Sequence, residues 1–525
     1  MNCYLTKESL SLAINHLSIY GDTDVFPYLP EIIFLSENLD DVVNELSTLD
    51  LNSYSPTHAF EALAPKSRYG FRIVHQLPYI DTVLLLASVI EIGPLIEASR
   101  PETTTAAAFS YRFSPDDSGR LFCPDHTYKD WLKKQQSHIL ENEEVKTVIS
   151  TDISDFYSRI NFHRLENLLD AAAPAHCAAK YIKKHIKVIR AKQSFGLPVG
   201  GSAARLLAEL ALTDTDMALM NEGYTATRFV DDFRIFLDSS MDPYDALSFL
   251  AKLLNINEGL SLNVAKTSVE TRGKFQLNLV HQLMDVTDEA AGIAFGQLTT
   301  QLYFDDEPDH EELEKLKKLN LLSFLENEIS KDNFDIGRIK VIFRALKLAK
   351  PQEAIGYIVE NFTRLVVFSK ELVLLMQVLE TDSPGCFDEL VDTVIESVLT
   401  PPASSVQLIK SWLLELFARG TVKLQVKDLK KLKSLNEVLD KRQTHIIHGH
   451  LANTNHFRSL KTSFGQFGTP EQICIILGAS CLPKDEYTNW LVGLKPNFDF
   501  PTSKLLLDWV RSEQSEIMKK MFVAQ

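Results

Sequence analysis

The sequence predicts an α+β protein with a mixed N-terminal half and an all-helical C-terminal half. Short β-branched and aromatic runs surround acidic residues at Asp152 and at Asp231-Asp232, as expected for strands. Beyond about residue 302 this alternation gives way to amphipathic stretches separated by Pro and Gly. A chain of 525 residues predicts two or more domains, and we expect the ranges 1–145, 146–290 and 291–525.

The acidic residues of the mixed half predict a metal site. A strand is predicted over residues 146–153, near the end of which lies Asp152, and Asp231-Asp232 are flanked by apolar residues on both sides as in a hairpin. If these strands are neighbours, each pair of carboxylates repels by roughly 4 kcal/mol at about 4 Å and an effective dielectric near 20. Such a cluster binds protons or cations. Oxygen ligands suit Mg²⁺, and two ions can hold both oxygens of a phosphoryl transfer.

Four blocks occur in order along the chain. They are Asp152 with Phe156-Tyr157, Gly196-Leu197-Pro198 with Gly200 and Ser202, Phe229-Val230-Asp231-Asp232, and Gly259 to Thr267 with Lys266. In residue type, order and spacing these blocks resemble the reverse transcriptase family over roughly residues 65–270. The resemblance implies a fingers–palm core, Mg²⁺ as cofactor (two ions, with Mn²⁺ as an alternative) and deoxynucleoside triphosphates as substrates.

The same resemblance implies roles for single residues. Asp152, Asp231 and Asp232 would be the catalytic metal ligands, and the backbone carbonyl of Ile153 a further ligand. Three consecutive residues would contact the nucleotide, and the last would crowd a ribose 2′-hydroxyl: Asp155, Phe156 and Tyr157. Lys266 would face the leaving pyrophosphate.

Basic residues outside these blocks are candidate phosphate contacts. Arg72 lies in a stretch similar to the family's fingers block, and Arg112 follows it; the planar fork of arginine binds phosphate oxygens bidentately. For each, the alternative is a surface arginine. Lys183 and Lys187 share one predicted helical face with Lys180 and Lys184, which indicates a track for a nucleic-acid backbone or, alternatively, a solvated face.

Two glycines complete the predicted nucleic-acid contacts. Gly200 and Gly201 would let a nucleic-acid backbone approach closely. Two departures from the family's pattern stand beside them: Val199 replaces the usual Gln, and Ala204-Arg205 replaces a Ser-Pro pair. In the family, those positions help to seat the template and the incoming base. Their loss favours synthesis without a template.

The acidic N-terminus carries a second resemblance. Residues 1–60 contain one Lys and nine acidic residues, which predicts a solvated helical cap or an acidic arm in the nucleic-acid channel. Gly21-Asp22-Thr23-Asp24 is similar to a stretch of phage-defence reverse transcriptases of the abortive-infection type. That type implies a helical-repeat C-terminus in place of a thumb, protein-primed synthesis of single-stranded DNA attached through a Tyr, and a homo-oligomer. RNA-templated synthesis of the retron or intron type and a non-catalytic scaffold are the alternatives.

The C-terminal half is predicted to consist of helices of about 10–18 residues, as in a HEAT-like repeat domain. The expected helices are Glu311 to Glu328, Ile336 to Leu348, Glu353 to Phe362, Glu371 to Glu380, Phe387 to Leu399, Ser405 to Phe417, Val426 to Asp440 and Ser503 to Lys519. Because no repeat period is clear, an irregular bundle remains open. Residues 421–470, with nine basic and three acidic residues, are expected to contact product nucleic acid or a neighbouring subunit.

Composition excludes several other classes of protein. The net charge of −16 has the wrong sign for a non-specific nucleic-acid coat. No apolar run is long enough to cross a bilayer, and no signal peptide is evident, so we expect no membrane partner. Six cysteines at spacings that suggest neither a metal site nor a disulfide predict a reducing, cytoplasmic location.

Overall fold

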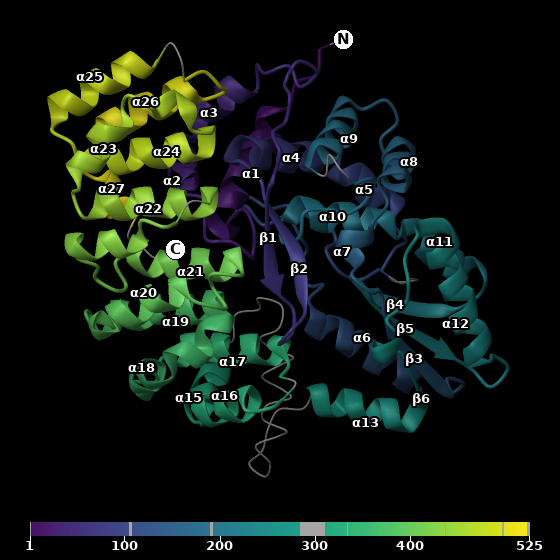
Figure 1. The fold of residues 1–525 in the computed structure, drawn as a ribbon. Helices are drawn as coiled ribbons and strands as arrows, with labels where there is room; N and C mark the ends of the chain where they lie inside the picture. Colours follow the sequence, from purple (N-terminus) through teal and green to yellow (C-terminus); the bar gives the residue numbers. More distant parts are fainter. Residues whose placement is uncertain are drawn as a thin grey trace. The chain divides into compact units, whose positions relative to one another are not determined.

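A computed structural model describes residues 2–103, 108–189, 193–283, 310–332, 334–435, 437–495 and 498–521 (Figure 1). Contacts divide the chain into two compact units, each built from separate stretches of sequence. The first unit consists of Met1–Thr23, Leu49–Ala59 and Asp81–Pro308, and the second of Asp24–Thr48, Phe60–Ile80 and Asp309–Gln525. These groupings differ from the three contiguous ranges expected from the sequence.

A four-stranded antiparallel sheet organises the first unit, with strand order β4-β5-β3-β6 (Figure 1). The strands are β3 (Thr147–Asp152), β4 (Thr225–Phe229), β5 (Asp232–Leu237) and β6 (Ser268–Thr271). Val148 and Ile149 of β3 are completely buried, as the β-branched run predicted. The strand expected over residues 146–153 and the hairpin around Asp231-Asp232 are both confirmed, and they are neighbours in the sheet.

The described part of the first unit also contains helices. They are α1 (Lys7–Tyr20), α4 (Tyr79–Glu91), α5 (Gly93–Ser99), α6 (Tyr128–Glu141), α7 (Phe156–Arg159), α8 (Phe162–Ala172), α9 (Cys177–Ile189), α10 (Ser202–Ala211), α11 (Thr213–Asn221), α12 (Pro243–Lys252) and α13 (Arg272–Leu283). α6 packs against α13 and β4, and α13 also contacts β3 and β6. Among the described residues no single helix has the length and apolar composition to cross a bilayer; α4 and α5 meet that test as a pair bent by 50°.

The second unit combines a two-stranded hairpin with many helices. The hairpin is β1 (Phe60–Pro65) with β2 (Phe71–Gln76). The helices are α2 (Glu31–Glu37), α3 (Leu39–Leu46), α15 (His310–Lys317), α16 (Leu321–Ile329), α17 (Ile336–Ala349), α18 (Glu353–Leu365), α19 (Ser369–Asp382), α20 (Val391–Leu399), α21 (Gln407–Ala418), α22 (Val438–His450), α23 (Thr454–Leu460), α24 (Thr469–Gly478), α25 (Lys484–Leu494), α26 (Ser503–Ser512) and α27 (Ile517–Lys520). The all-helical character expected after residue 302 is thus confirmed for the described residues, whereas a regular HEAT-like repeat stays a prediction.

Segments from the N-terminal part of the chain are integral to the second unit. Trp412 donates its indole N–H to the carbonyl of Val25 at 2.8 Å, and Trp509 donates to Glu37 at 2.8 Å. The hydroxyls of Tyr79 and Thr502 lie 2.7 Å apart. Residues separated by more than 380 positions therefore form one core.

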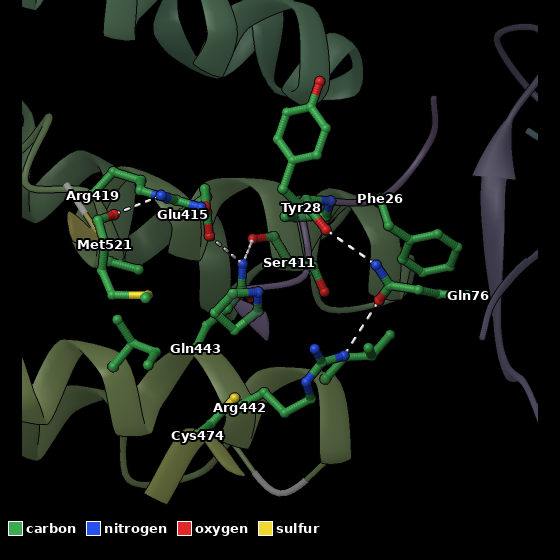
Figure 2. Close-up of a pocket in the computed structure, with 15 residues that line it drawn as sticks. Phe26, Tyr28, Gln76, Ser411, Glu415, Arg419, Arg442, Gln443, Cys474 and Met521 are labelled. Carbon is green, nitrogen blue, oxygen red and sulfur yellow. Dashed lines mark hydrogen bonds and ion pairs between the residues drawn. The ribbon is translucent and has the colours of Figure 1, made fainter. Parts of the chain in front are cut away.

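A pocket in the second unit shows the same interleaving (Figure 2). Its lining combines Phe26, Pro27, Tyr28, Pro30 and Gln76 with residues from α21, α22, α24 and Met521. Gln76 donates to the carbonyl of Pro27 at 3.1 Å and accepts from Arg442 at 3.3 Å. These bonds connect N-terminal residues to the helical region.

One expectation about the cysteines was wrong. Cys3 and Cys177 form a disulfide, with their Cα atoms 5.5 Å apart, although 174 positions separate them in sequence. Sequence spacing could not reveal this pair, because the fold brings the N-terminal segment to the start of α9. Cys123, Cys386, Cys474 and Cys481 are not in disulfides.

Candidate active site

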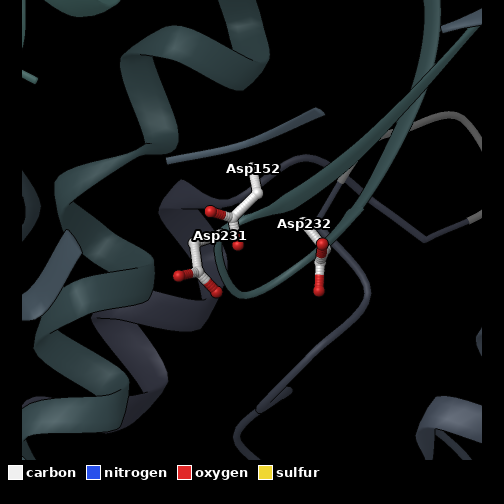
Figure 3. Close-up of side chains that lie close together, drawn as sticks. All are labelled: Asp152, Asp231 and Asp232. Atoms are coloured by element: carbon white, nitrogen blue, oxygen red, sulfur yellow. The ribbon is translucent and has the colours of Figure 1, made fainter. Parts of the chain in front are cut away.

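Three carboxylates converge at one end of the central strands (Figure 3). Asp152 is the last residue of β3, and its cross-strand partner is Asp232, the first residue of β5. Asp231 lies in the turn before β5, and its carbonyl accepts a hydrogen bond from the N–H of Ile153 at 3.1 Å. One oxygen from each carboxylate lies within 4.8 Å of the others. The sequence prediction that these residues meet is therefore confirmed.

The turn between β4 and β5 is short and unusual. Only Val230 and Asp231 separate the strands, and Val230 has a φ of 57°. The left-handed region costs an ordinary residue about 1–2 kcal/mol, and a β-branched residue is rarely found there. Both backbone polar groups of Val230 are held: its N–H donates to the hydroxyl of Ser110 at 2.8 Å, and its carbonyl accepts from Arg228 at 2.9 Å.

Electrostatics in this cluster favour a bound cation. Burial, together with the nearby carboxylates of Asp232 and Asp152, raises the pKa of Asp231 to about 7. Burial also raises the pKa of Asp232. Because ionised carboxylates at this distance repel one another, an oxygen-binding divalent cation would be stabilised here. The donor set of three carboxylates therefore fits a divalent metal ion such as Mg²⁺.

Lys266 lies beside the triad, as the sequence predicted. Its ammonium group lies 2.7 Å from Asp152. Burial opposes the charge on Lys266, but the hydrogen bond to Asp152 and the attraction of the three carboxylates raise its pKa. The side-chain amide of Asn263 donates to the other oxygen of Asp152 at 3.0 Å. Asn263 was missed as a site residue, although it lies within the fourth block.

The residues after Asp152 connect β3 to the short helix α7. Ile153 is buried, Asp155 is exposed and begins α7 with a φ of 50°, and Phe156 is buried. The ring of Tyr157 lies 5.5 Å from that of Phe156. Burial raises the pKa of Tyr157 well above its ordinary value, so the phenol stays protonated. Its backbone carbonyl accepts from the N–H of Leu197 at 2.8 Å, which connects the first and second blocks.

The two predicted glycines precede α10. Gly200 has a φ of 106°, which glycine adopts without strain. A Cβ atom on Gly201 would lie 3.3 Å from the carbonyl oxygen of Asp22. At Gly201 the observed close approach is thus to the protein's own backbone.

Arg112 and Arg72 lie in different environments. Arg112 is buried and pairs with Glu97 at 2.6 Å, and it donates to the carbonyls of Ala108 and Pro101 at 3.0 and 2.9 Å. These contacts indicate a structural role for Arg112. Arg72 lies on β2 in the second unit, opposite Ala64.

The predicted lysine track belongs to α9. Lys183 pairs with Asp170 at 2.6 Å, and Lys187 pairs with Glu166 at 2.5 Å, both acids coming from α8. Lys184 donates to the backbone carbonyl of Asn52 at 3.2 Å. The expected shared face exists, and the neighbouring helix partly neutralises it.

In the basic region 421–470, histidines contact one another. His445 lies 3.0 Å from His456 and 3.2 Å from Glu471, with distances taken between side-chain atoms. The ring centroids of His448 and His456 are 3.6 Å apart. Burial lowers the pKa of His448 to about 4 and that of His456 to about 3, so both are neutral near pH 7.

Comparison with known proteins assigns a family to the region that holds the triad. Residues 103–315 match the family model described as reverse transcriptase (RNA-dependent DNA polymerase). No curated protein sequence matches the chain. The matched region contains Asp152, Asp231, Asp232 and Lys266. The triad therefore lies within a region similar to reverse transcriptase domains.

Several solved structures are similar to the chain at low identity. Telomerase from Candida tropicalis is 13% identical, over 69% of this chain and 68% of that chain, with a TM-score of 0.32. A form of it truncated from its C-terminal domain is 15% identical, over 41% of this chain and 51% of that chain, with a TM-score of 0.30. The chain thus spans about half the length of that truncated form. The RNA-dependent RNA polymerase of a human picorbirnavirus is 11% identical, over 76% of this chain and 80% of that chain, with a TM-score of 0.29. TM-scores this low carry no argument, so the family match is the informative finding.

Proposed function

We propose that this protein synthesises single-stranded DNA from deoxynucleoside triphosphates, without a template and primed by a hydroxyl of its own chain. The observation that carries the proposal is the convergence of Asp152, Asp231 and Asp232 within the region that matches reverse transcriptases. The similarity of Gly21-Asp22-Thr23-Asp24 to abortive-infection enzymes supports a role in anti-phage defence. In that role we expect a homo-oligomer, a HEAT-like C-terminal scaffold and a cytoplasmic location.

The chemistry follows from the chain's own groups around the triad. Asp152, Asp231 and Asp232, with the carbonyl of Ile153, would hold two Mg²⁺ or Mn²⁺ ions, which supply Lewis-acid activation of the hydroxyl and charge neutralisation at phosphate oxygens. The hydroxyl oxygen forms a bond to the α-phosphorus, and the bond from that phosphorus to the pyrophosphate oxygen breaks. The hydroxyl proton passes to water, and Lys266 is placed to protonate the leaving pyrophosphate.

The remaining predicted contacts are proposed for the nucleotide and the product. Asp155, Phe156 and Tyr157 lie three to five positions after Asp152, which supports a place beside the incoming nucleotide. Arg72 is proposed for the triphosphate, and Lys183, Lys187 and the Gly200-Gly201 pair for the product backbone. Val199 and Ala204, at positions that seat a template in the family, support synthesis without one.

A labelling experiment tests the proposal. Purified protein is incubated with labelled deoxynucleotides and Mg²⁺, without template or primer, and is then denatured and separated by size. We expect label that stays on the protein and is released by nuclease. Asp231→Asn removes a triad carboxylate and should abolish labelling, whereas Asp238→Asn changes an exposed turn carboxylate at the other end of β5 and should leave it intact. No incorporation by the unaltered protein, even with template and primer, would overturn the proposal.

Peptide mapping of the labelled protein would identify the primer. Among the described tyrosines, Tyr69 and Tyr244 are each 82% exposed, so their hydroxyls can be delivered to a site. Tyr157 is unsuitable, because it is held between buried groups next to the triad. We expect the nucleotide to remain on an exposed tyrosine after nuclease digestion.

RNA-templated synthesis is a second candidate, because the matched family is described as RNA-dependent. It predicts that incorporation depends on added RNA and that the product follows the RNA sequence. The two candidates differ in one measurement, the incorporation of a single deoxynucleotide species with and without a defined template. Equal incorporation in both conditions favours the first candidate.

A further inference from the structure

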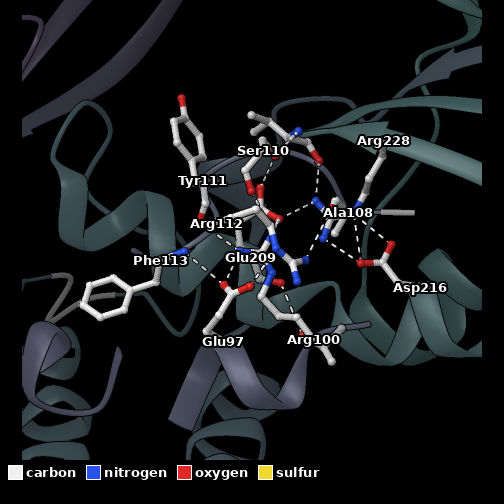
Figure 4. Close-up of polar contacts among 12 residues, drawn as sticks. Glu97, Arg100, Ala108, Ser110, Tyr111, Arg112, Phe113, Glu209, Asp216 and Arg228 are labelled. Atoms are coloured by element: carbon white, nitrogen blue, oxygen red, sulfur yellow. Dashed lines mark hydrogen bonds and ion pairs between the residues drawn. The ribbon is translucent and has the colours of Figure 1, made fainter. Parts of the chain in front are cut away.

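A buried network of ionic groups contacts Val230, the residue before Asp231. Figure 4 shows the members of this network. Three arginines and three carboxylates make up its charged members: Arg100, Arg112, Arg228, Glu97, Glu209 and Asp216. We propose that Ser110 and Arg228, held in place by Glu209, are positioning residues that keep the Asp231 turn in the geometry that binds metal. This inference rests on the metal chemistry of the proposed function, but not on the primer or the template.

Glu209 is the centre of this network. One of its oxygens accepts from Arg100 at 2.8 Å and lies 2.9 Å from Arg228, and the other accepts from the hydroxyl of Ser110 at 2.5 Å. Glu209 is 1% exposed. Contacts with two arginines and Ser110 hold both of its oxygens in fixed positions.

Arg228 connects Glu209 to the turn that contains Asp231. It is completely buried, and its guanidinium binds both oxygens of Asp216 at 2.8 to 3.1 Å. Burial opposes its charge, but the adjacent Asp216 and Glu209 raise its pKa. The guanidinium nitrogen of Arg228 that does not bind Asp216 donates to the carbonyl of Val230 at 2.9 Å. One face of the turn is therefore fixed by a side chain that cannot rotate freely.

Ser110 fixes the other polar group of Val230. Its hydroxyl accepts from the N–H of Val230 at 2.8 Å and donates its proton to Glu209. Ser110 is completely buried. A single hydroxyl thus connects Glu209 to the residue just before Asp231.

The backbone of Val230 explains why this support matters. A β-branched residue with a φ of 57° favours a return to the extended region. Such a return would rotate the peptide that joins it to Asp231 and move that carboxylate away from Asp152. The hydrogen bonds from Ser110 and Arg228 oppose this movement, so their loss should weaken metal binding before it unfolds the protein.

Ser110 is the residue to vary, because it is uncharged and its removal leaves the ion pairs intact. Ser110→Ala removes the hydroxyl, and Ser110→Thr keeps it. Ser88→Ala is the matched control: Ser88 is also completely buried, lies in the same unit, and donates to the carbonyl of Leu84 within α4 at 2.7 Å. All variants are made in the full chain.

The primary measurement is Mn²⁺ affinity from the electron paramagnetic resonance signal of the unbound ion. We expect Ser110→Ala to bind roughly tenfold more weakly, in the range that loss of a ligand-orienting partner produces. Ser110→Thr should restore binding to within about threefold, and Ser88→Ala should not change it. Hydrogen exchange at the Val230 amide should become faster in Ser110→Ala alone.

The outcomes are distinct. Unchanged Mn²⁺ affinity in a folded Ser110→Ala variant would overturn the inference, and so would equal losses in the Ala and Thr variants. If Ser110→Ala does not fold, Ser110→Cys takes its place, because a thiol is only a weak hydrogen-bond donor and acceptor. Unchanged Mn²⁺ affinity and Val230 exchange in that variant would equally overturn the inference. Wild-type protein that binds Mn²⁺ without incorporating nucleotides would contradict the proposed function alone.

Discussion

Asp231 occupies the most constrained position of the triad, in a two-residue turn after a left-handed valine. Its convergence with Asp152 and Asp232 was predictable, because the apolar runs around these acids predicted neighbouring strands. The pairing of its neighbour Val230 with Ser110 was not predictable. The two lie 120 positions apart, and a serine in a loop gives no sequence signal for a buried contact.

Asp231→Asn should lower nucleotide incorporation by more than about 100-fold, beyond the usual effect of losing an outer partner of a metal ligand. The protein should remain folded, since the amide relieves repulsion among the carboxylates that raise the pKa of Asp231. Incorporation and the melting temperature without metal are measured at pH 8. A parallel fall in melting temperature would show that the loss of activity comes from unfolding.

His185 provides a prediction about acid stability. Burial lowers its pKa to about 3, and neither ring nitrogen has a hydrogen-bond partner among the described residues. The unfolded chain takes up the proton near pH 6.5, so between about pH 6.5 and 3 the unfolded state binds more protons, and stability falls as pH falls. From pH 7.5 to 5 this single group should lower the free energy of unfolding by about 2 kcal/mol.

His185→Phe should remove that pH-dependent contribution, because phenylalanine does not titrate and can keep the ring contact with Tyr181, whose centroid lies 5.5 Å away. The measurement is the free energy of unfolding from urea titrations at pH 7.5 and 5 for both proteins. Other histidines contribute equally to each protein and cancel in the difference. Parallel pH profiles would contradict the assignment.

At the scale of elements, residue patterns predicted the strands and helices themselves. They did not predict which elements lie next to each other. The apolar run before Asp152 and the paired acids in a hairpin predicted β3, β4 and β5 correctly. Helical spacing predicted correctly that Lys183 and Lys187 share a face. It could not predict that α8 places Asp170 and Glu166 opposite them, since a face pattern contains no information about the neighbouring helix.

The α9 lysines offer a prediction at this scale. Exposed ion pairs contribute only about 0.2–1 kcal/mol each. A DNA phosphate can therefore replace Asp170 or Glu166 as the partner of these lysines. Lys183→Ala combined with Lys187→Ala should weaken binding of single-stranded DNA and reduce the slope of log affinity against log salt by roughly 1.4. Fluorescence anisotropy across several salt concentrations measures both quantities.

The control variant removes the negative charges of the two acids that pair with these lysines. Asp170→Asn with Glu166→Gln frees the same lysines and should strengthen DNA binding. If both double variants bind DNA as the unaltered protein does, α9 is a structural helix and the product lies elsewhere.

At the scale of the molecule, the sequence predicted a mixed α/β part and an all-helical part. It did not predict which stretches of the chain belong to each unit. Residues 24–48 and 60–80 carry no compositional sign that they belong with helices hundreds of positions later. Such long-range partners depend on which buried groups meet in the folded chain. For example, the indole N–H of Trp412 donates to the backbone carbonyl of Val25. The Cys3–Cys177 disulfide escaped prediction for the same reason.

That disulfide should stabilise the first unit. A cross-link that spans 174 positions restricts the unfolded chain, and removal of such a bond typically costs about 2–4 kcal/mol. Cys177→Ser should lower the unfolding free energy by that amount, and reductant should do the same to the unaltered protein. Cys123→Ser is the control. Equal stability with and without reductant would show that the bond is not formed in solution.

The division of the chain has a consequence for its synthesis. Residues 24–48 and 60–80 leave the ribosome well before residue 309, where the rest of their unit begins. At about 5–20 residues per second, roughly 10–45 s of translation separates them from their packing partners. Leu35, Val42 and Val74 are buried in the finished protein, and during that interval the rest of their unit has not yet been made. We expect a chaperone that holds the nascent chain to raise the yield of folded protein.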